Sequence, residues 1–315
     1  MRAFRVCGVS IAALSMQDAA TRLVEAAIER RSYQVHLCNY TSLAACIQIP
    51  RIVTVIHDLQ FLTFPQYFSR RKRLFQRLAV KTTCRRSSSV VAISKFTASE
   101  VLRFEPSVCS KLTAIPNPID WSRFRDHARP ATAGDFPKRF FLLPAAQYPH
   151  KNIQTVVEAL KFVLAEDANV GLVLTGQIAM NLHSTVAAGP TLLGTNVHML
   201  GHVTDSELAW LYSNCTAVVI PSLYEGFGLP AVEVLGQGRP VIHSGRTALA
   251  EVTQGLGTTV LDPLHPKEWA RAMLDVQSQH EDALPSHTLD EFREQYSLSR
   301  VGQLYWKLLR TGSSS

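Results

Sequence analysis

The sequence predicts an α/β protein of two domains, with a doubly wound parallel sheet in the second. From residue 140 to residue 262, short apolar runs alternate with helical segments about as long as a βαβ unit requires. The chain has 315 residues, which is enough for two buried cores. Hydrophobic residues make up 46% and charged residues 18% of it, which is typical of a globular protein and excludes a disordered one.

The charge balance favours an anionic partner. The net charge is +7 and the isoelectric point is near 9.2, so a membrane surface, a nucleic acid or a phosphorylated substrate would fit. No apolar run approaches the length of a membrane span, and the start lacks the apolar core of a signal peptide. The six cysteines lack CxxC or metal-like spacing, as expected for reduced thiols. We therefore expect a cytoplasmic protein.

Residues 1–47 predict a strand, a helix and a second strand. Phe4–Val9 and Tyr33–Cys38 have strand character, and Ala19–Arg30 carries apolar residues at helical spacing. The string VCGVSIAALSMQDAATRLVEAAIE, followed by VHLCN, resembles the start of the WecG/TagA/CpsF glycosyltransferases. This resemblance covers less than a sixth of the chain, and we transfer no activity from it.

Residues 51–59 predict a buried strand that ends in a histidine. Arg51–Ile56 is apolar and β-branched, and His57-Asp58-Leu59 follows it directly. The carboxyl ends of parallel strands are where open α/β sheets bind ligands. A lone histidine is more often structural. The position alone therefore leaves open whether His57 has a structural role or contacts a ligand.

Residues 69–81 predict a basic amphipathic helix. The chain has no acid between Asp58 and Glu100, and Leu74, Phe75 and Leu78 share one helical face. Such helices attract anionic lipid with about 1 kcal/mol for each basic residue near the surface. A solvated helix over the core would explain the pattern equally well, and nucleic-acid binding is less favoured because no reader motif accompanies the charge. The residues of the membrane hypothesis are Arg70, Arg71, Lys72, Arg73 and Arg77.

The first domain then closes with two further strands. Ser89–Ser94 predicts a strand, and either Ser94 or Thr97 caps the helix that follows. Leu112–Asp120 predicts the last strand and a turn, and the stretch Asp126–Lys138 is a linker rich in Pro, Ala, Gly and Asp.

The second domain predicts a series of strand and helix pairs. Its first strand, Phe140–Leu143, runs into the turn Pro144–Asn152, and a helix begins at Ile153. The other predicted elements are a strand with a glycine turn at Val170–Gly176, a strand at Val197–Val203, a helix start at Thr204–Leu208, and closing helices at Pro263–Ser278 and Leu289–Leu309.

The stretch Pro221–Glu233 carries the strongest functional signal. It follows the buried-type strand Ala217–Ile220, and Pro230 stands where a proline fits the first turn of a helix. The backbone N–H groups before that helix, beside the positive end of its dipole, form an anion site. Glu225 in the loop and Glu233 in the expected first helical turn can each accept two hydroxyl protons from a diol. Phosphates beside two diols describe a nucleotide-sugar, whereas an ordinary βα turn with surface glutamates is the alternative.

The thirteen residues PSLYEGFGLPAVE resemble the paired-glutamate signature of the family-4 retaining glycosyltransferases. Matches in the same order extend over roughly residues 50–310, including IPNPID at residues 115–120. The resemblance implies the GT-B fold, in which two Rossmann-like doubly wound domains face a cleft. The glycine-rich loop expected after the first strand is missing, so we expect a shortened or atypical amino-terminal domain.

The resemblance also implies roles for individual residues. Lys151 matches the family's lysine that grips the donor diphosphate, whereas Gln147 replaces its arginine and can donate a hydrogen bond but no charge. Val203 falls in the loop against the base, and His57 matches a histidine that reaches the donor sugar. The implied donor-binding residues are Gln147, Lys151, Val203, Glu225, Gly226, Phe227, Gly228, Leu229 and Glu233, and the implied catalytic residues are His57, Lys151 and Glu225.

The expected activity is therefore transfer of a hexose, of mannose type or similar, from a nucleotide-diphosphate sugar to a hydroxyl with retention. The expected acceptor is a glycan or a lipid-linked glycan in polysaccharide biosynthesis, at the inner face of a membrane. No DxD pair indicates a metal, and we expect no cofactor besides the nucleotide-sugar. A nucleotide-sugar-binding protein without turnover and a nucleotide-sugar epimerase remain alternatives.

The expected domain organisation follows from the same pattern. Residues 1–130 form the acceptor-side domain, within which 1–47 are atypical, and residues 138–290 form the donor-binding domain. Residues 291–315 form a closing helix and tail.

Overall fold

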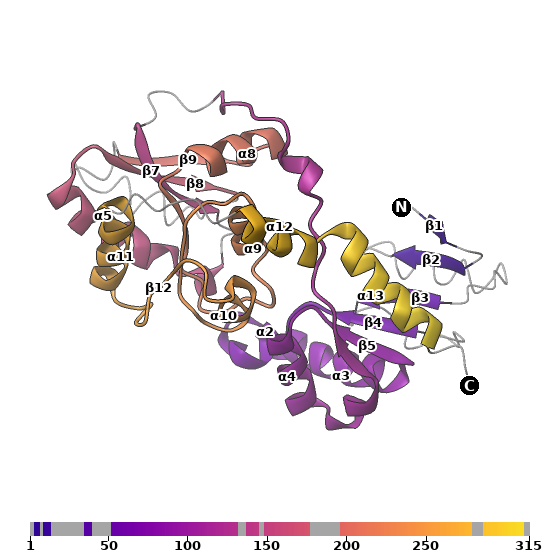
Figure 1. Ribbon diagram of the computed structural model, residues 1–315. Helices are drawn as coiled ribbons and strands as arrows, with labels where there is room; N and C mark the ends of the chain where they lie inside the picture. The colour runs from indigo at the N-terminus through magenta and orange to yellow at the C-terminus, as the bar shows by residue number, and fades with distance from the viewer. Residues whose placement is uncertain are drawn as a thin grey trace. The chain divides into compact units, whose positions relative to one another are not determined.

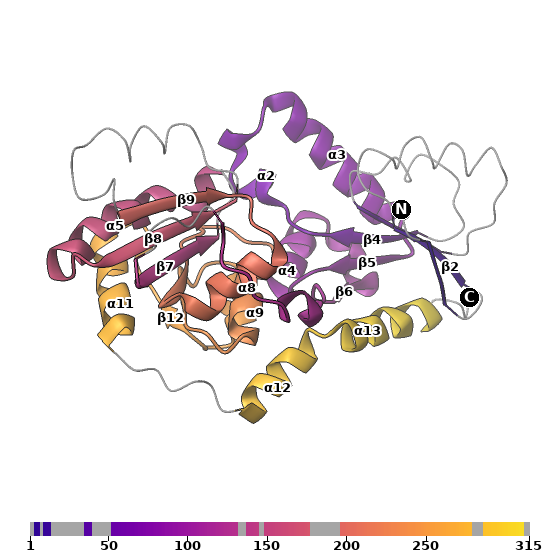
Figure 2. The same ribbon diagram turned by 90° about the horizontal axis from the view of Figure 1, so that it is seen from above.

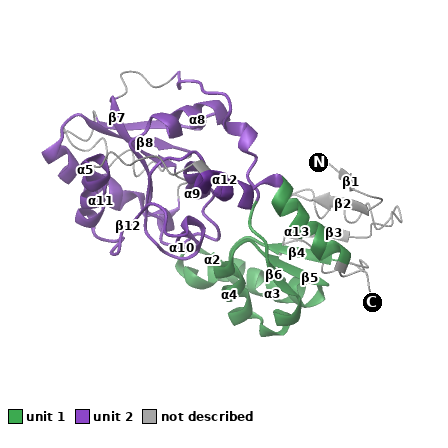
Figure 3. Ribbon diagram, viewed as in Figure 1, with its two compact units in different colours: residues 1–117, 299–315 green, residues 118–298 purple. Residues whose placement is uncertain are grey.

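The computed structural model describes residues 3–6, 9–13, 35–39, 52–131, 137–144, 148–176, 196–278 and 286–311 (Figure 1). The chain divides into two compact units, which we call the first unit (residues 1–117 and 299–315) and the second unit (residues 118–298; Figure 3). Each unit is built on one sheet of six described strands.

The first unit has a mixed sheet in the order β1-β2-β3-β4-β5-β6. Strands β1 and β2 pair antiparallel, and the remaining neighbours pair in parallel. The single strand expected at Phe4–Val9 is thus replaced by two antiparallel strands, while the helix expected at Ala19–Arg30 lies outside the described residues. The strands are β1 (Ala3–Val6), β2 (Val9–Ala13), β3 (Val35–Asn39), β4 (Ile52–Ile56), β5 (Ser89–Ala92) and β6 (Leu112–Ala114).

Helices cover both faces of this sheet, as Figure 2 shows for α3 and α13. On one face, Ile56 and Val90 pack against Val80 and Cys84 of α3. On the other face, the alternate strand residues pack against α13. Ser94 is the N-cap of α4, because its hydroxyl accepts a hydrogen bond from the Thr97 amide at 3.0 Å. The helices are α2 (Gln60–Thr63), η2 (Pro65–Tyr67), α3 (Arg70–Arg86), α4 (Lys95–Phe104), η3 (Pro106–Lys111) and α13 (Leu298–Thr311).

The second unit has an all-parallel sheet in the order β12-β11-β10-β7-β8-β9. The chain winds outward from β7 to β9, returns to β10 beside β7, and winds outward again to β12. This is the doubly wound arrangement expected from the sequence. The strands are β7 (Arg139–Pro144), β8 (Val170–Thr175), β9 (Val197–Gly201), β10 (Ala217–Ile220), β11 (Val241–His243) and β12 (Thr258–Thr259).

The core of the second unit lies between this sheet and the helices α5 and α11, with Trp269 as its largest fully buried side chain. The expected closing helix at Leu289–Leu309 is two helices, α12 and α13, which belong mainly to different units. In the described residues, no helix combines the length and the apolar character needed to cross a bilayer. The helices are η4 (Trp121–Phe124), η5 (Pro149–Lys151), α5 (Ile153–Glu166), α8 (Asp205–Asn214), α9 (Leu229–Gly236), α10 (Ala248–Thr253), α11 (Pro266–Ser278) and α12 (Ser286–Gln295).

Candidate functional site

The candidate site lies at the point where the winding of the second sheet reverses. Strands β7 and β10 are parallel neighbours there, so the loops after them leave the sheet at the same edge in opposite directions. The loop after β7 carries Lys151 and the loop after β10 carries Glu225. A backbone hydrogen bond of 2.8 Å from the Leu223 amide to the His150 carbonyl joins the two loops.

Lys151 and Glu225 form an ion pair, with 2.6 Å between Nζ and Oε1. The side chains are only 22% and 14% exposed, so solvent screens this pair less than a pair on an open surface. Thr247 holds the backbone of Glu225, because its hydroxyl accepts from the Glu225 amide at 2.9 Å and donates to the Glu225 carbonyl at 3.1 Å. Two residues assigned to the donor site from the sequence therefore meet in the folded chain.

The turn before α5 is fixed around Lys151. Asn152 has a left-handed backbone (φ 53°), and its side-chain Nδ2 donates a hydrogen bond to the Pro263 carbonyl at 2.7 Å. His150 is buried and stacks on Tyr148 with 5.6 Å between ring centroids. Burial and the neighbouring Lys151 charge lower the pKa of His150 to about 4, so its ring is neutral near pH 7. Gln147 lies outside the described residues.

The loop after β10 ends at a glycine that opens α9. Gly228 is the N-cap with φ 97°, and Pro230 lies in the first turn as the sequence predicts. In this first turn Pro230 has no N–H, and the Ala231 amide donates to the Gly228 carbonyl at 3.0 Å. The Leu229 amide is therefore the first-turn donor that faces the loop side. The prediction that Glu233 lies in the first turn was wrong: because α9 starts at Leu229, Glu233 lies in its second turn. The side chain of Phe227 is buried against Tyr296, with ring centroids 5.8 Å apart.

Glu233 is the centre of a buried polar network. Its Oε2 accepts a hydrogen bond from the Tyr212 hydroxyl at 3.0 Å, and its Oε1 accepts one from Arg123 at 3.4 Å. Arg123 also forms a two-pronged pair with Asp205, at 3.0 and 2.6 Å. Burial raises the pKa of Glu233, whereas Tyr212 and Arg123 act in the opposite direction. The carboxylate is thus held in one orientation from two sides.

Sequence patterns gave no sign of Arg123, Tyr212 or Asp205 in this network. Arg123 is 110 residues from Glu233 along the chain, and no local spacing reports so distant a contact. The neighbours of Tyr212 in the sequence are largely hydrophobic, a pattern typical of core residues, so it was not singled out as part of a site. Only the position of Arg123, three residues after the last residue of IPNPID, could have drawn attention to it.

The predicted base loop follows β9. Val203 is half-buried there, between the left-handed Gly201 (φ 69°) and the start of α8. Thr204 and Glu207 form a reciprocal capping box, in agreement with the predicted helix start. The loop therefore leads directly to Asp205, the partner of Arg123.

His57 belongs to the first unit, whereas the other site residues belong to the second. It directly follows β4 and is exposed. Partial desolvation lowers its pKa, although the Asp58 charge acts in the opposite direction. The neutral ring that results near pH 7 can both donate and accept a hydrogen bond.

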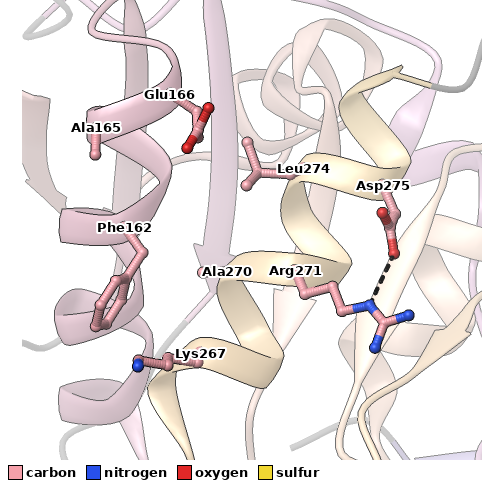
Figure 4. Close-up of a pocket in the computed structure, with 8 residues that line it drawn as sticks. All are labelled: Phe162, Ala165, Glu166, Lys267, Ala270, Arg271, Leu274 and Asp275. Atoms are coloured by element: carbon pink, nitrogen blue, oxygen red, sulfur yellow. Dashed lines mark ion pairs between the residues drawn. The ribbon is translucent and has the colours of Figure 1, made fainter.

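A groove with a volume of about 340 Å³ lies between α5 and α11 (Figure 4). The Lys267 amine lies 5.7 Å from the centre of the Phe162 ring, and Arg271 pairs with Asp275 at 3.9 Å. Phe162 lies in the second half of α5, whereas Lys151 lies two residues before the start of that helix at Ile153. The groove therefore contains none of the predicted site residues.

Comparison with protein families gives two consecutive matches. Residues 125–285, just over half of the chain, match the family described as Glycosyl transferases group 1. Residues 13–123 match Glycosyltransferase Family 4. The second match includes most of the stretch that resembles WecG/TagA/CpsF, and that resemblance stays a prediction.

Two curated relatives are named O-antigen mannosyltransferases. The chain is 27% identical over 224 residues to O-antigen chain mannosyltransferase RfbU of Salmonella typhimurium, covering 70% of this chain and 60% of the relative. It is 28% identical over 247 residues to O-antigen chain mannosyltransferase B of Escherichia coli, covering 74% and 63%. The chain thus spans about three fifths of the length of these relatives.

Solved structures show the same fold. Anabaena Alr3699/HepE in complex with UDP and glucose has a TM-score of 0.73 at 18% identity, covering 94% of this chain and 83% of that one. Sucrose-phosphate synthase from Thermosynechococcus elongatus has a TM-score of 0.71 at 19% identity, covering 92% and 77%. These likenesses confirm the GT-B class expected from the sequence. The family match over residues 125–285 shows that the chain belongs to the group 1 glycosyl transferases.

Proposed function

We propose that the protein transfers a hexose, of mannose type, from a nucleotide-diphosphate sugar to a hydroxyl of a glycan or lipid-linked acceptor, with retention. The names of the two O-antigen mannosyltransferases support the sugar and the link to polysaccharide biosynthesis. The observation that carries the proposal is the meeting of Lys151 and Glu225 at the reversal point of the second sheet, at 2.6 Å. Such a point is where doubly wound sheets bind nucleotides.

The donor would lie along the start of α9. Lys151, Gln147 and the backbone amides of Gly226–Leu229 would bind the diphosphate, aided by the positive end of the helix dipole. Glu225 would accept hydrogen bonds from the sugar hydroxyls, and Glu233 would accept them from the ribose diol. The free protein holds the Lys151 amine against Glu225, so the diphosphate would compete with that carboxylate for the amine.

The reaction breaks the bond between the anomeric carbon and the diphosphate oxygen and forms a bond from that carbon to the acceptor oxygen. The proton of the acceptor hydroxyl passes to the departing phosphate oxygen on the same face of the sugar, which gives retention. Lys151 would stabilise the charge that develops on the diphosphate, and this supports a mechanism without a metal. We assign to His57 a contact with the donor sugar.

The acceptor would place the enzyme at a membrane. A lipid-linked glycan is held in the bilayer surface, so the proposed transfer would be carried out by a peripheral protein at its inner face. The basic residues first assigned to this contact are Arg70, Arg71, Lys72, Arg73 and Arg77 of α3.

Donor binding can be tested with a panel of nucleotide-sugars that varies both base and sugar. A true donor at about 100 times its dissociation constant stabilises the protein by roughly 2.7 kcal/mol, which is measurable as a higher melting temperature. Lys151→Ala and Glu233→Ala should remove the shift. Lys267→Ala, in the groove between α5 and α11, is the matched control and should retain it.

Transfer is then measured with the donor that binds. The product formed on a lipid-linked acceptor should keep the anomeric configuration of the donor, as read by NMR. Donor binding without transfer or hydrolysis would instead identify a binding protein. Conversion of the free donor into its epimer would identify an epimerase. An unchanged melting temperature with every nucleotide-sugar would overturn the proposal as a whole.

A further inference from the structure

Helix α3 presents apolar side chains to solvent on the side away from the core. Leu74, Phe75 and Leu78, here called the apolar triad, are 61%, 53% and 57% exposed. The buried positions of the same helix are Gln76, Val80, Thr83 and Cys84. The amphipathic pattern read from the sequence is therefore reversed from the usual case, in which the large apolar residues of a surface helix face the core.

Helical geometry places the two sets on opposite sides. With about 100° of rotation per residue, the three triad positions fall within about 100° of arc, roughly opposite the buried positions. Figure 2 shows α3 along one face of the first unit's sheet, opposite the face that α13 covers. Of the large hydrophobic residues exposed in the described part of this unit, only Tyr67 lies outside the triad. The exposure is thus a local feature of α3.

The triad is surrounded by positive charge. Helix α3 contains eight basic residues and no acidic one. The acids on the elements packed beside it compensate this charge only in part. Glu105 pairs with Arg85 at 3.1 Å in the last turn, and Glu100 lies beside Thr63 and Arg103. Phosphate-rich surfaces are the complementary partner for such a helix.

The first turn of α3 is rich in positive charge, which is unfavourable at the amino end of a helix. The residues Arg70–Arg73 are all basic, although the amino end of a helix carries partial positive charge. The Ser69 hydroxyl accepts a hydrogen bond from the Lys72 amide at 3.3 Å. This cap gives one first-turn amide an acceptor, but it brings no negative charge to balance the basic side chains. An external anion at this end would relieve the repulsion, and helix amino ends bind phosphate groups readily.

We propose that this face of α3 docks on a bilayer that contains anionic lipid. The apolar triad enters between the headgroups, and the surrounding Arg and Lys side chains contact lipid phosphates while their stems lie along the apolar boundary. A nucleic acid would satisfy the charge but leaves three adjacent apolar side chains without a hydrocarbon environment. This deepens the membrane association proposed above by naming the inserting residues, and it does not rest on glycosyl transfer.

The test is vesicle binding without donor or acceptor, so its failure is distinct from failure of the transfer assay. The full chain should cosediment with vesicles of equal parts phosphatidylcholine and phosphatidylglycerol but not with pure phosphatidylcholine. Replacing the triad by Leu74→Gln, Phe75→Gln and Leu78→Gln should weaken binding about tenfold or more, because insertion is lost. Leu261→Gln with Leu264→Gln, which changes side chains 85% and 62% exposed in the second unit, is the matched control and should bind normally.

A second measurement covers the case in which the triad variant folds poorly. Phe75→Trp should show more fluorescence quenching by lipids with brominated acyl chains than the wild type, whose own tryptophans give the background. Arg70→Gln with Arg71→Gln should reduce the part of the binding that falls with rising salt. The proposal is overturned if the folded triad variant binds the mixed vesicles like wild type, if wild type ignores them, or if the new tryptophan is not quenched. An RNA oligonucleotide that binds wild type and triad variant equally and displaces the vesicles would assign the face to nucleic acid.

Discussion

The hydroxyl of Tyr212 donates a hydrogen bond of 3.0 Å to Oε2 of Glu233, and both side chains are buried. Tyr212 comes from α8 and Glu233 from α9, so this bond ties together two helices that begin at the same edge of the sheet. It fixes one carboxylate oxygen and leaves the other to Arg123. The group assigned to the ribose is therefore positioned before any ligand arrives.

Tyr212→Phe should weaken both the fold and donor binding. The change leaves Oε2 of Glu233 buried without its donor, for which about 1–3 kcal/mol of stability is expected to be lost. Chemical denaturation would measure this loss, and titration calorimetry would show a weaker donor affinity. Tyr305→Phe in α13 removes a hydroxyl from the other unit and is the matched control. Equal donor affinity in wild type and Tyr212→Phe would show that the bond does not position the carboxylate.

Donor affinity should fall as the pH is lowered, and this loss should begin at a higher pH than the ordinary pKa of a glutamate would give. Burial raises the pKa of Glu233, and only the ionised carboxylate accepts two hydroxyl protons. Arg123→Met removes a charge that holds this pKa down, so the loss of affinity should move to higher pH. Binding isotherms across pH 4 to 8 would measure both curves, and a profile that Arg123→Met leaves in place would contradict the assignment.

The raised pKa of Glu233 makes folding stability and donor affinity change in opposite directions with pH. Because the pKa of Glu233 is raised on folding, the folded state holds the proton more tightly than the unfolded state. This group therefore lowers the free energy of unfolding as pH rises from the ordinary glutamate value through the raised one. Glu233→Gln should remove that dependence, and denaturation curves of both proteins at several pH values would show the difference.

Glu225→Gln should separate the two halves of the donor. Glu225 holds the Lys151 amine at 2.6 Å, so removing its charge frees the amine for phosphate. A nucleoside diphosphate without sugar should then bind as tightly as to wild type or more tightly, whereas the complete nucleotide-sugar loses the contact to its hydroxyls. Lys151→Ala should weaken both ligands. Calorimetry with each ligand measures its affinity for wild type and for both variants, and equal effects of the two substitutions on both ligands would rule out these separate roles.

Local patterns were sufficient to predict the strand, loop and helix around Glu225. Turn glycines, the position of Pro230 and the capping box at Thr204 are rules of neighbouring residues, and the structure follows them. The partners of Glu233 were not predicted, because Arg123 reaches it across 110 residues. The role of the apolar triad could not be decided from the sequence, because a helical period shows that residues share a face but not which face packs against the core. The sequence indicates the left-handed backbone of Asn152 only through the residue type, because asparagine adopts this conformation more readily than most residues.

Three glycine substitutions test the two ends of α9 and the interior of α13. Gly228 has φ 97°, so Gly228→Ala places an alanine in a left-handed conformation, at a loss of roughly 1–2 kcal/mol. Its Cβ would also lie 2.7 Å from Cδ2 of Leu249, so that side chain must shift. A Cβ on Gly236 would lie 2.2 Å from the ring of Trp121, and that ring is fixed by a hydrogen bond of 3.0 Å from Nε1 to the Arg293 carbonyl. Gly236→Ala should therefore destabilise the second unit through crowding.

Gly302→Ala is the control for this series, because a Cβ there meets nothing within 4 Å and the residue lies within α13. It should stabilise the protein by about 0.5–1 kcal/mol, as alanine does in a helix. Donor binding distinguishes the other two: Gly228→Ala disturbs the amides that open α9 and should weaken donor affinity, whereas Gly236→Ala lies at the far end of that helix. If Gly228→Ala lowered the melting temperature but left the affinity for the nucleotide-sugar unchanged, the amino end of α9 would not be the phosphate site.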